Sequence, residues 1–321
     1  MNPDEAVQRC GQKPGFLAQN ASHGCFQVRL PGTCGELVQG TLDGTPFLVS
    51  CPIDLYATVG VTLGEGPGPV VAPRNVPKAR AALAATLAAQ GQEGRGARLQ
   101  VTSPLIRSKG LGSSTADVGG AILAAAAALG RELSPEELGR LAVGVEPSDS
   151  TLFPGLALFD HRGATLYEPL GPAPALDILV LDCGGTVDTQ AYNRRDHSEP
   201  LRQLAPRHRE ALEALRAGLR TGDLELVGHA ATLSAQAHQT ILYKPALDAT
   251  LALARQVGAV GVNVGHSGTV IGILLDPRRS DTGAVAGFVK KRLEQVVLLF
   301  VTRLVNGGAA GVRCQTSNVK R

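Results

Sequence analysis

The residues with the clearest chemical potential lie between Ser103 and Gly120, in the sequence SPLIRSKGLGSSTADVGG. The pattern predicts a strand, a Gly-Leu-Gly-Ser-Ser turn and then an apolar helix from about Ser114. Glycines let backbone N–H groups converge, and the first turn of a helix adds unpaired donors at its positive dipole end. The segment therefore predicts a phosphate-binding turn. The alternative is a plain glycine turn in which Ser114 is an ordinary N-cap.

Two common nucleotide-binding loops do not fit this segment. The chain contains no GxxxxGK[ST] sequence, and Thr115 stands where a Rossmann fingerprint needs its last glycine. Lys109 adds a cation just before the glycines, either to contact a phosphate or to remain an exposed charge. The sequence therefore predicts an anion-binding turn of another design.

A second group of polar residues follows a helix that is expected to start near Ser134. The sequence Ser134-Pro135-Glu136-Glu137 has the N-cap, the first-turn proline and the glutamate of a capping box. Beyond this helix, Glu146 and Asp149 carry two carboxylates in a segment that Pro147 keeps out of helix. Phosphoryl transfer from ATP needs a metal ion and a group that accepts or orients the hydroxyl proton. The two carboxylates could serve these two needs, or they are solvated acids at a helix end.

Two further segments are dense in glycine. They are PGTCGELVQG at 31–40 and GVNVGHSGTVIGILL at 261–275. Each adjoins a predicted strand, where glycine usually marks a tight corner. Their significance comes from their order, because one precedes and the other follows the two polar groups.

The composition excludes several classes of function. The net charge is only +3 and aromatic residues make up 3% of the chain, so a surface that binds nucleic acid is not expected. The first ten residues lack an apolar core, and the longest apolar run, 118–130, is too short to span a bilayer. The six cysteines are scattered without a CxxC pair. We expect a cytoplasmic protein that binds neither nucleic acid nor a membrane, with a homodimer left open.

The elements that would position these residues alternate between strands and helices. The Pro-rich segment GPAPA at 171–175 is the best candidate for a boundary between two halves. We expect an N-terminal domain at 25–170, a C-terminal domain at 171–315 and a poorly ordered extension at 1–24. The recurring hairpin patterns favour a mixed α/β protein over a doubly wound parallel sheet.

The four segments together resemble the GHMP small-molecule kinases, the family of galactokinase, homoserine kinase, mevalonate kinase and phosphomevalonate kinase. Members of this family have an early Pro-Gly turn, a proline followed by a Gly-Leu-x-Ser-Ser phosphate loop, and a late glycine-rich loop. The corresponding segments here are Pro31-Gly32, Pro104 with 110–114, and 261–272. The resemblance covers about residues 25–310.

Within the family the likeness is greatest to the L-threonine kinases of cobalamin biosynthesis. The segments that carry this likeness are PGTCGELVQG, CPIDLYATV, KGLGSSTAD and EPSD. The resemblance implies an α+β, two-domain GHMP kinase fold with the active site between the domains. It implies that the N-terminal domain is ribosomal-protein-S5-domain-2-like and binds ATP, and that the C-terminal domain is a ferredoxin-like α/β sandwich. It further implies ATP and Mg²⁺ as cofactors, L-threonine as the small-molecule substrate, and O-phospho-L-threonine as a precursor of the aminopropanol phosphate linker.

The resemblance also implies roles for individual residues. Asp149 and Lys109 are implied as catalytic groups, and Ser114 with Glu146 as ligands of magnesium. The implied nucleotide-binding residues are Pro104, Lys109, Gly110, Leu111, Gly112, Ser113, Ser114 and Thr115. The implied substrate-binding residues are Glu36, Asp54, Asp149, Gly265, His266 and Ser267.

Several of these roles have open alternatives. Asp149 could accept or orient the hydroxyl proton, or it could pair with the substrate ammonium. Asp54 could simply end a strand, and His266 could be a loop residue beside the phosphates. Asp117, in the first turn of the predicted helix, is expected to be structural or to pair with Lys109. Two alternatives to threonine phosphorylation also stay open: a GHMP kinase for another small alcohol such as homoserine, and a catalytically silent nucleotide-binding paralogue.

Overall fold

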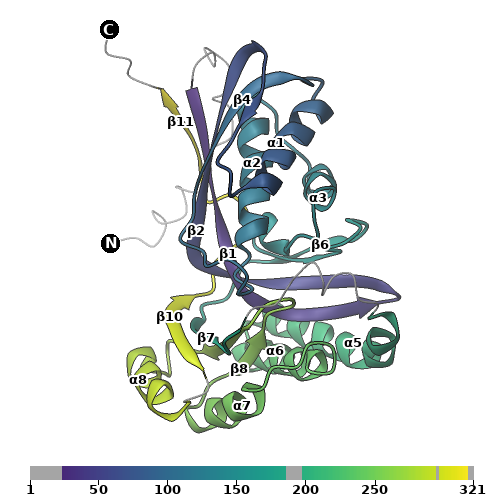
Figure 1. Ribbon diagram of the computed structural model, residues 1–321. Coiled ribbons are helices and arrows are strands. Elements are labelled where there is room, and N and C mark those ends of the chain that lie inside the picture. Colours follow the sequence, from purple (N-terminus) through teal and green to yellow (C-terminus); the bar gives the residue numbers. More distant parts are fainter. Residues whose placement is uncertain (1–23, 186–196, 294–295, 317–321) are drawn as a thin grey trace, which may run out of the picture.

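A long antiparallel hairpin runs through the middle of the molecule (Figure 1). The computed structural model of the protein describes residues 24–185, 197–293 and 296–316. The hairpin consists of β1 (Gly24–Leu42) and β2 (Thr45–Pro67). Its tip is the pair Asp43-Gly44, whose φ angles of 50° and 86° are those that a tight hairpin turn requires.

The hairpin bends where the first glycine-dense segment lies. The register between β1 and β2 shifts between Pro31 and Gly32, between Thr33 and Glu36, and between Glu36 and Val38. Irregularities of this kind bend a strand and increase its local twist. In Figure 1 the two strands accordingly run vertically at the top and nearly horizontally at the right. This bend brings the segment 31–40 to the centre of the molecule.

The N-terminal half places three helices against one face of the sheet (Figure 1). β4 pairs antiparallel with β2, and β3 pairs parallel with β4. These elements are β3 (Val70–Val71), α1 (Pro77–Ala89), β4 (Arg95–Thr102), α2 (Ser113–Ala128) and α3 (Pro135–Val143). Gly120 lets α2 approach the sheet closely, because a Cβ there would lie 2.5 Å from Val59 Cγ2. The predicted capping box at Ser134 is confirmed, with Ser134 and Glu137 bonded reciprocally.

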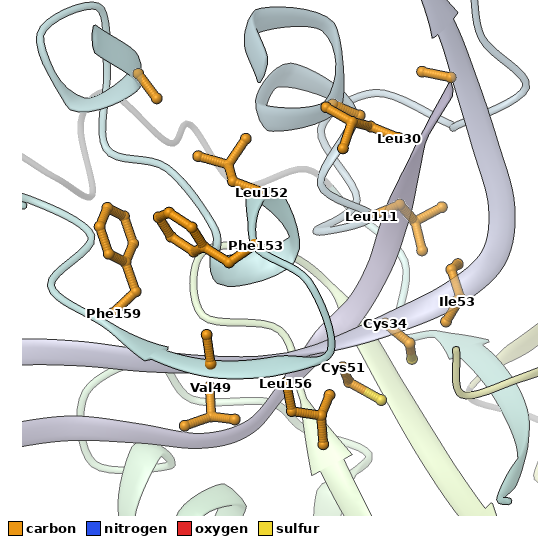
Figure 2. Close-up of a cluster of buried hydrophobic side chains, with 14 of the residues drawn as sticks. Leu30, Cys34, Val49, Cys51, Ile53, Leu111, Leu152, Phe153, Leu156 and Phe159 are labelled. Atoms are coloured by element: carbon orange, nitrogen blue, oxygen red, sulfur yellow. The ribbon is translucent and has the colours of Figure 1, made fainter. Parts of the chain in front are cut away.

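A short hairpin closes the N-terminal half over the buried aromatic rings in Figure 2. It follows the single-turn helix η2 (Ser150–Leu152) and consists of β5 (Leu156–Phe159) and β6 (Tyr167–Gly171). β5 also pairs with β2, through Phe159 and Leu48. The ring centroids of Phe153 and Phe159 lie 4.8 Å apart. Leu111, in the predicted phosphate-binding turn, packs in the same core and is 1% exposed.

In its described residues up to 303, the C-terminal half adds four antiparallel strands and four helices. The strands are β7 (Asp177–Asp182), β8 (Gly261–Val264), β9 (Val270–Leu275) and β10 (Val297–Arg303). The helices are α5 (Ser198–Thr221), α6 (Leu224–His238), α7 (Leu247–Gln256) and α8 (Thr282–Arg292). In Figure 1, α5 and α6 lie to the right of these strands, α7 below them and α8 to the left of β10. β8 meets β1 at the pair Val264 and Glu36. The sheet is therefore continuous in the order β10-β7-β9-β8-β1-β2-β4-β3.

The last described strand returns to the N-terminal half. β11 (Val312–Thr316) pairs antiparallel with the start of β1. The prediction for the extension at 1–24 falls on residues 1–23, which lie outside the described residues, and on Gly24, which begins β1. Within the described ranges, no helix is both long and apolar enough to cross a membrane.

Candidate active site

The predicted phosphate-binding turn lies between β4 and α2. Gly110 and Gly112 have φ angles of 88° and 66°, which residues other than glycine rarely adopt. Gly112 is the N-cap of α2 and no side chain caps the helix there. The N-terminus of this long apolar helix therefore offers backbone N–H groups and its positive dipole end to an anion. The alternative in which Ser114 is an ordinary N-cap is wrong, because the helix begins at Ser113 and Ser114 lies inside its first turn.

The bent segment of β1 fixes the turn from one side. The Thr33 backbone N–H donates to the Leu111 carbonyl at 3.0 Å, and the Gly35 N–H donates to the Gly110 carbonyl at 3.4 Å. Gly35 has a φ of 59°, and a Cβ there would lie 2.3 Å from the Val264 carbonyl oxygen. Only glycine fits between β8 and the phosphate-binding turn at this position.

The late glycine loop fixes the turn from the other side. The backbone N–H groups of Thr269 and Val270 donate to the Lys109 carbonyl at 2.9 and 3.1 Å. A Cβ on Gly268 would lie 2.3 Å from Gly110 Cα. The three glycine-rich segments that are far apart in the sequence therefore meet at one place.

Two side chains at the end of α6 and just after it bind the back of the late glycine loop. Lys244 Nζ donates to the Gly268 carbonyl at 2.5 Å, and His238 Nε2 donates to the His266 carbonyl at 2.8 Å. Burial lowers the pKa of Lys244 to about 8. Because the C=O and N–H of a trans peptide point in opposite directions, these bonds turn the following N–H groups away from α6.

A polar group lies at the mouth of the turn. The Ser114 hydroxyl donates to Glu146 Oε1, and Lys78 Nζ lies 2.5 Å from Glu146 Oε2. A hydroxyl and a carboxylate are the oxygen ligands that Mg²⁺ prefers. Ser114 and Glu146 therefore fit a magnesium ion, and Lys78 adds a positive charge beside them.

Asp149 lies against the same turn. Its backbone N–H donates to Thr115 Oγ1 at 3.1 Å, and its Oδ2 lies 3.0 Å from where a Cβ on Gly112 would be. Burial raises the pKa of Asp149 to about 6; the charge of Glu146 adds to this rise and a hydrogen bond from Thr115 opposes it. Such a carboxyl is ionised near neutral pH and can still accept a proton.

Glu36 is a second buried carboxyl close to Asp149. Burial raises its pKa well above the usual value, the charge of Asp149 raises it further, and a hydrogen bond from Ser50 lowers it. Among the described residues, Glu36 Oε2 has no hydrogen-bond partner. A cationic group of a ligand would satisfy this oxygen and favour the ionised carboxylate.

These groups face a common cavity. The cavity has a volume of about 380 Å³. Its lining includes most of the residues described above, together with Ser267: Glu36, Lys78, Gly110, Gly112, Ser114, Thr115, Glu146, Asp149, His266 and Ser267. The structure therefore brings most of the predicted site residues together, and it adds Lys78, which the sequence patterns did not single out.

Comparison with known proteins identifies the family. The sequence matches the GHMP kinases N terminal domain at residues 77–153 and the GHMP kinases C terminal domain at 200–294. It is 37% identical over 286 residues to the L-threonine kinase of Salmonella typhimurium, covering 88% of this chain and 94% of that protein. The chain belongs to the GHMP kinase family. It is also 37% identical over 290 residues to the L-threonine kinase of Citrobacter freundii, covering 88% of this chain and 98% of the relative.

Solved structures share the GHMP kinase fold. A homoserine kinase from Cytophaga hutchinsonii has a TM-score of 0.66 at 18% identity, covering 93% of this chain and 99% of that one. The Methanococcus jannaschii mevalonate kinase has a TM-score of 0.64 at 16% identity, covering 87% and 98%. A complex of MDDEF with MVAPP, AMPPCP and magnesium has a TM-score of 0.68 at 16% identity, covering 92% and 99%. The predicted two-domain GHMP kinase fold is confirmed.

Some predicted site residues of this GHMP kinase lie elsewhere. Lys109 Nζ lies 2.7 Å from Asp182 Oδ2 and donates to the Gly185 carbonyl at 2.8 Å. Lys109 does not line the cavity beside the phosphate-binding turn. Its ammonium therefore holds the turn to the end of β7. It neither faces the phosphate-binding cavity nor remains an unpaired exposed charge, the two possibilities that the sequence left open. Asp54 is exposed, its Oδ2 lies 3.6 Å from Arg303 Nε, and it does not line the cavity beside the phosphate-binding turn.

Three other residues singled out from the sequence, Pro104, Gly265 and Asp117, hold the structure together or lie outside the cavity. Pro104 is exposed on the approach to the turn and does not line its cavity. The Gly265 N–H donates to the Val270 carbonyl at 3.0 Å, which closes the late glycine loop. Asp117 pairs with Arg107 at 2.8 Å rather than with Lys109.

Proposed function

We propose that this GHMP kinase transfers the γ-phosphoryl group of ATP to the hydroxyl of free L-threonine, producing ADP and O-phospho-L-threonine. The observation that carries the proposal is the convergence of the phosphate-binding turn, the Ser114–Glu146 pair and Asp149 on one cavity. The identity of 37% to two L-threonine kinases over 88% of the chain supports threonine as the acceptor.

The backbone of the turn binds the phosphates of ATP in this proposal. The glycine conformations of the turn and the uncapped start of α2 provide N–H donors. Ser114 and Glu146 would hold Mg²⁺, which neutralises phosphate charge when it is bound. Lys78, at the edge of the same cavity, adds a cation that attracts the phosphates. The late glycine loop fixes the turn in this conformation.

The acceptor hydroxyl faces Asp149. The threonine oxygen attacks the γ-phosphorus, an O–P bond forms, and the bond from that phosphorus to the bridging oxygen of ADP breaks. The hydroxyl proton passes to the Asp149 carboxylate, whose pKa of about 6 suits a proton acceptor. Glu36 binds the substrate ammonium through its buried carboxylate, because the ammonium offsets the cost of ionising this group.

The proposed biological setting comes from the resemblance to the L-threonine kinases of cobalamin biosynthesis. O-phospho-L-threonine would be used by a decarboxylase that makes the aminopropanol phosphate linker of cobalamin. A cytoplasmic location is consistent with the cysteines, because Cys25, Cys34, Cys51 and Cys183 are free thiols.

A substrate comparison tests the proposed function. ADP release is measured with magnesium and ATP over L-threonine, L-serine, L-homoserine and mevalonate, and the phosphorylated product is identified by ³¹P NMR. We expect kcat/KM for threonine to exceed that for serine about tenfold or more, the usual effect of one methyl group in a fitted pocket. Equal rates on all acceptors contradict the threonine assignment. ATP binding without turnover of any acceptor supports a catalytically silent paralogue instead.

A further inference from the structure

A second cavity adjoins the one beside the phosphate-binding turn. It has a volume of about 1120 Å³, and His266 lines both cavities. Its deep wall contains buried polar side chains that the proposed mechanism does not use: Gln39, His161, His208 and His238. Many of its other lining residues belong to α5. His266 is the residue through which the second cavity meets the first.

Two of these side chains present unsatisfied nitrogen atoms. Among the described residues, Gln39 Nε2 and both ring nitrogens of His161 are buried without a hydrogen-bond partner. Gln39 and His161 are only 2% and 3% exposed. His208 and His238 differ, because His208 Nδ1 accepts from the Thr41 N–H at 3.2 Å and His238 Nε2 donates to the His266 carbonyl. Buried polar atoms without partners reduce stability, so a ligand is the natural partner for them.

Both side chains contact His266. His266 Nδ1 donates to Gln39 Oε1 at 2.6 Å, which leaves the amide N–H groups of Gln39 for another acceptor. The rings of His161 and His266 meet edge to face, with centroids 4.9 Å apart. The unsatisfied nitrogens of Gln39 and His161 are thus held next to the residue that the two cavities have in common.

The backbone places these nitrogens near the acceptor end of the active site. β1 carries an irregularity between Glu36 and Val38, opposite Ser50 and Val49 of β2. Because one extra residue reverses the alternation of a strand, Glu36 and Gln39 lie on the same face, with Cα atoms at most about 10 Å apart. The His161 carbonyl accepts from the Ser148 N–H at 3.0 Å, which places His161 beside the turn that carries Asp149.

The charge distribution fits an amino acid with both of its charges. Glu36 and Asp149 form an acidic end that suits an ammonium group and a hydroxyl. Gln39 and His161 form an end that donates hydrogen bonds. Burial lowers the pKa of His161 to about 4, so its neutral ring carries one N–H and one lone pair at neutral pH. Arg162 also lines this cavity and adds a positive charge.

We propose that Gln39 and His161 bind the α-carboxylate of the amino-acid substrate through the Gln39 amide and the His161 ring N–H. This inference rests on the proposed function, which supplies a free amino acid as the acceptor. It assigns the carboxylate to the donor end of the second cavity, while Glu36 binds the ammonium and Asp149 faces the hydroxyl. The two residues determine specificity, because an alcohol that lacks the carboxylate does not satisfy them.

Two variants and a matched pair of substrates test the carboxylate site. His161→Phe keeps the ring and its packing on His266 but removes both nitrogens. Gln39→Glu keeps the acceptor for His266 and replaces the donor by a carboxylate oxygen. Each variant is assayed on L-threonine and on L-threoninol, in which a CH₂OH group replaces the carboxylate. We expect each to lower kcat/KM for threonine about tenfold or more, mainly through KM, with a change below about twofold for threoninol.

Thermal unfolding separates binding from a structural role. His161→Phe removes buried atoms without protein partners among the described residues, so we expect the protein without ligand to unfold at the same or a higher temperature. Arg209→Gln is the control, because Arg209 lines the same cavity but is exposed and pairs with Asp43. This control should change the threonine to threoninol ratio by less than about twofold.

The outcomes distinguish this proposal from the proposed function. An equal loss on threonine and threoninol, or no loss on threonine, overturns the carboxylate site even if the enzyme is a threonine kinase. A wild-type protein that prefers homoserine contradicts the threonine assignment, and the same variants on homoserine and 2-amino-1,4-butanediol then decide the carboxylate site. A wild-type protein that phosphorylates no free amino acid contradicts both.

Discussion

At the scale of single residues, the site contains three carboxyls whose surroundings give them different properties. Glu146 contacts Ser114 and Lys78 at the edge of the cavity. Asp149 and Glu36 are buried, and burial raises the pKa of both. Glu146 therefore suits a metal ion, while the ionisation of Asp149 and Glu36 depends on the charge of the bound ligand. This division supports different roles for residues that the sequence presents only as acids.

Replacing Asp149 tests its role as the proton acceptor. Asp149→Asn should lower kcat about 10²- to 10⁴-fold, the usual contribution of a general base. In the wild-type protein kcat/KM should fall below about pH 6, where Asp149 becomes protonated. The variant should lack this pH dependence. If Asp149 is only a counter-charge for the ammonium, the variant would instead raise KM for threonine and keep kcat.

The same substitution has an expected effect on stability. The pKa of Asp149 is higher in the folded protein, at about 6, than the ordinary value of 3.8 expected in the unfolded chain. Ionisation of this group therefore opposes folding as the pH rises from the lower to the higher of these two pKa values. Asp149→Asn removes this unfavourable ionisation above about pH 6. We therefore expect the inactive variant to have an unchanged or higher Tm at pH 8, measured by differential scanning calorimetry. A lower Tm would indicate that Asp149 stabilises the fold.

At the scale of elements, the glycine loops act as one assembly around the phosphate-binding turn. Gly35 admits β8 and Gly268 admits the turn itself, each at distances that no side chain allows. The Lys109 carbonyl accepts two N–H groups from the late glycine loop, and the Leu111 carbonyl accepts one from β1. The conformation of the turn therefore depends on two distant segments.

Replacing Gly268 tests this dependence. In Gly268→Ala, the new Cβ would lie 2.3 Å from Gly110 Cα, so the late loop must move away from the turn. We expect KM for ATP to rise about tenfold or more, because a small displacement of groups that position a substrate costs a large factor. Gly287→Ala in α8 is the control, since a Cβ there meets nothing within 4 Å. The control should stabilise the protein by about 1 kcal/mol and leave KM unchanged.

The sequence predicts these elements well where the signal is local. The glycine turns, the capping box at Ser134 and the antiparallel hairpins follow from short-range backbone preferences. The apolar pattern predicts a helix from about Ser114, one residue after the observed start of α2 at Ser113, and the left-handed Gly112 is the N-cap. Gly112 also packs against Thr33, since a Cβ there would lie 3.1 Å from Thr33 Cγ2, and a local sequence pattern does not contain this contact.

The sequence patterns did not predict contacts between segments that are far apart in the chain. Lys109 binds Asp182 at the end of β7, and Lys78 reaches Glu146 from α1. Lys244 follows α6 and has no motif of its own, yet it binds the late glycine loop. Gln39 was noticed only as part of the segment 31–40, because its buried, unsatisfied nitrogen matters only once His161 lies beside it. In each case tertiary packing, rather than spacing along the chain, creates the contact.

At the scale of the whole molecule, the two halves are joined by more than a linker. The sheet passes from β8 to β1 without interruption, and β11 returns to the start of β1. One hydrophobic core includes residues of both halves, such as Leu30, Leu83, Ile178 and Leu215. The domain boundary near residue 171 stays a prediction from the sequence. Continuous packing of this kind favours a single cooperative unfolding transition.

A matched pair of core substitutions tests this cooperativity. Leu83→Ala in α1 and Leu215→Ala in α5 each remove a fully buried side chain, one from each half. Each should cost about 2–5 kcal/mol and lower the midpoint of one shared transition. Calorimetry gives the number of transitions, and hydrogen exchange by mass spectrometry shows which peptides open together. If each substitution destabilises only its own half, the active site lies between two independently folding domains, and ATP binding would then have to align them.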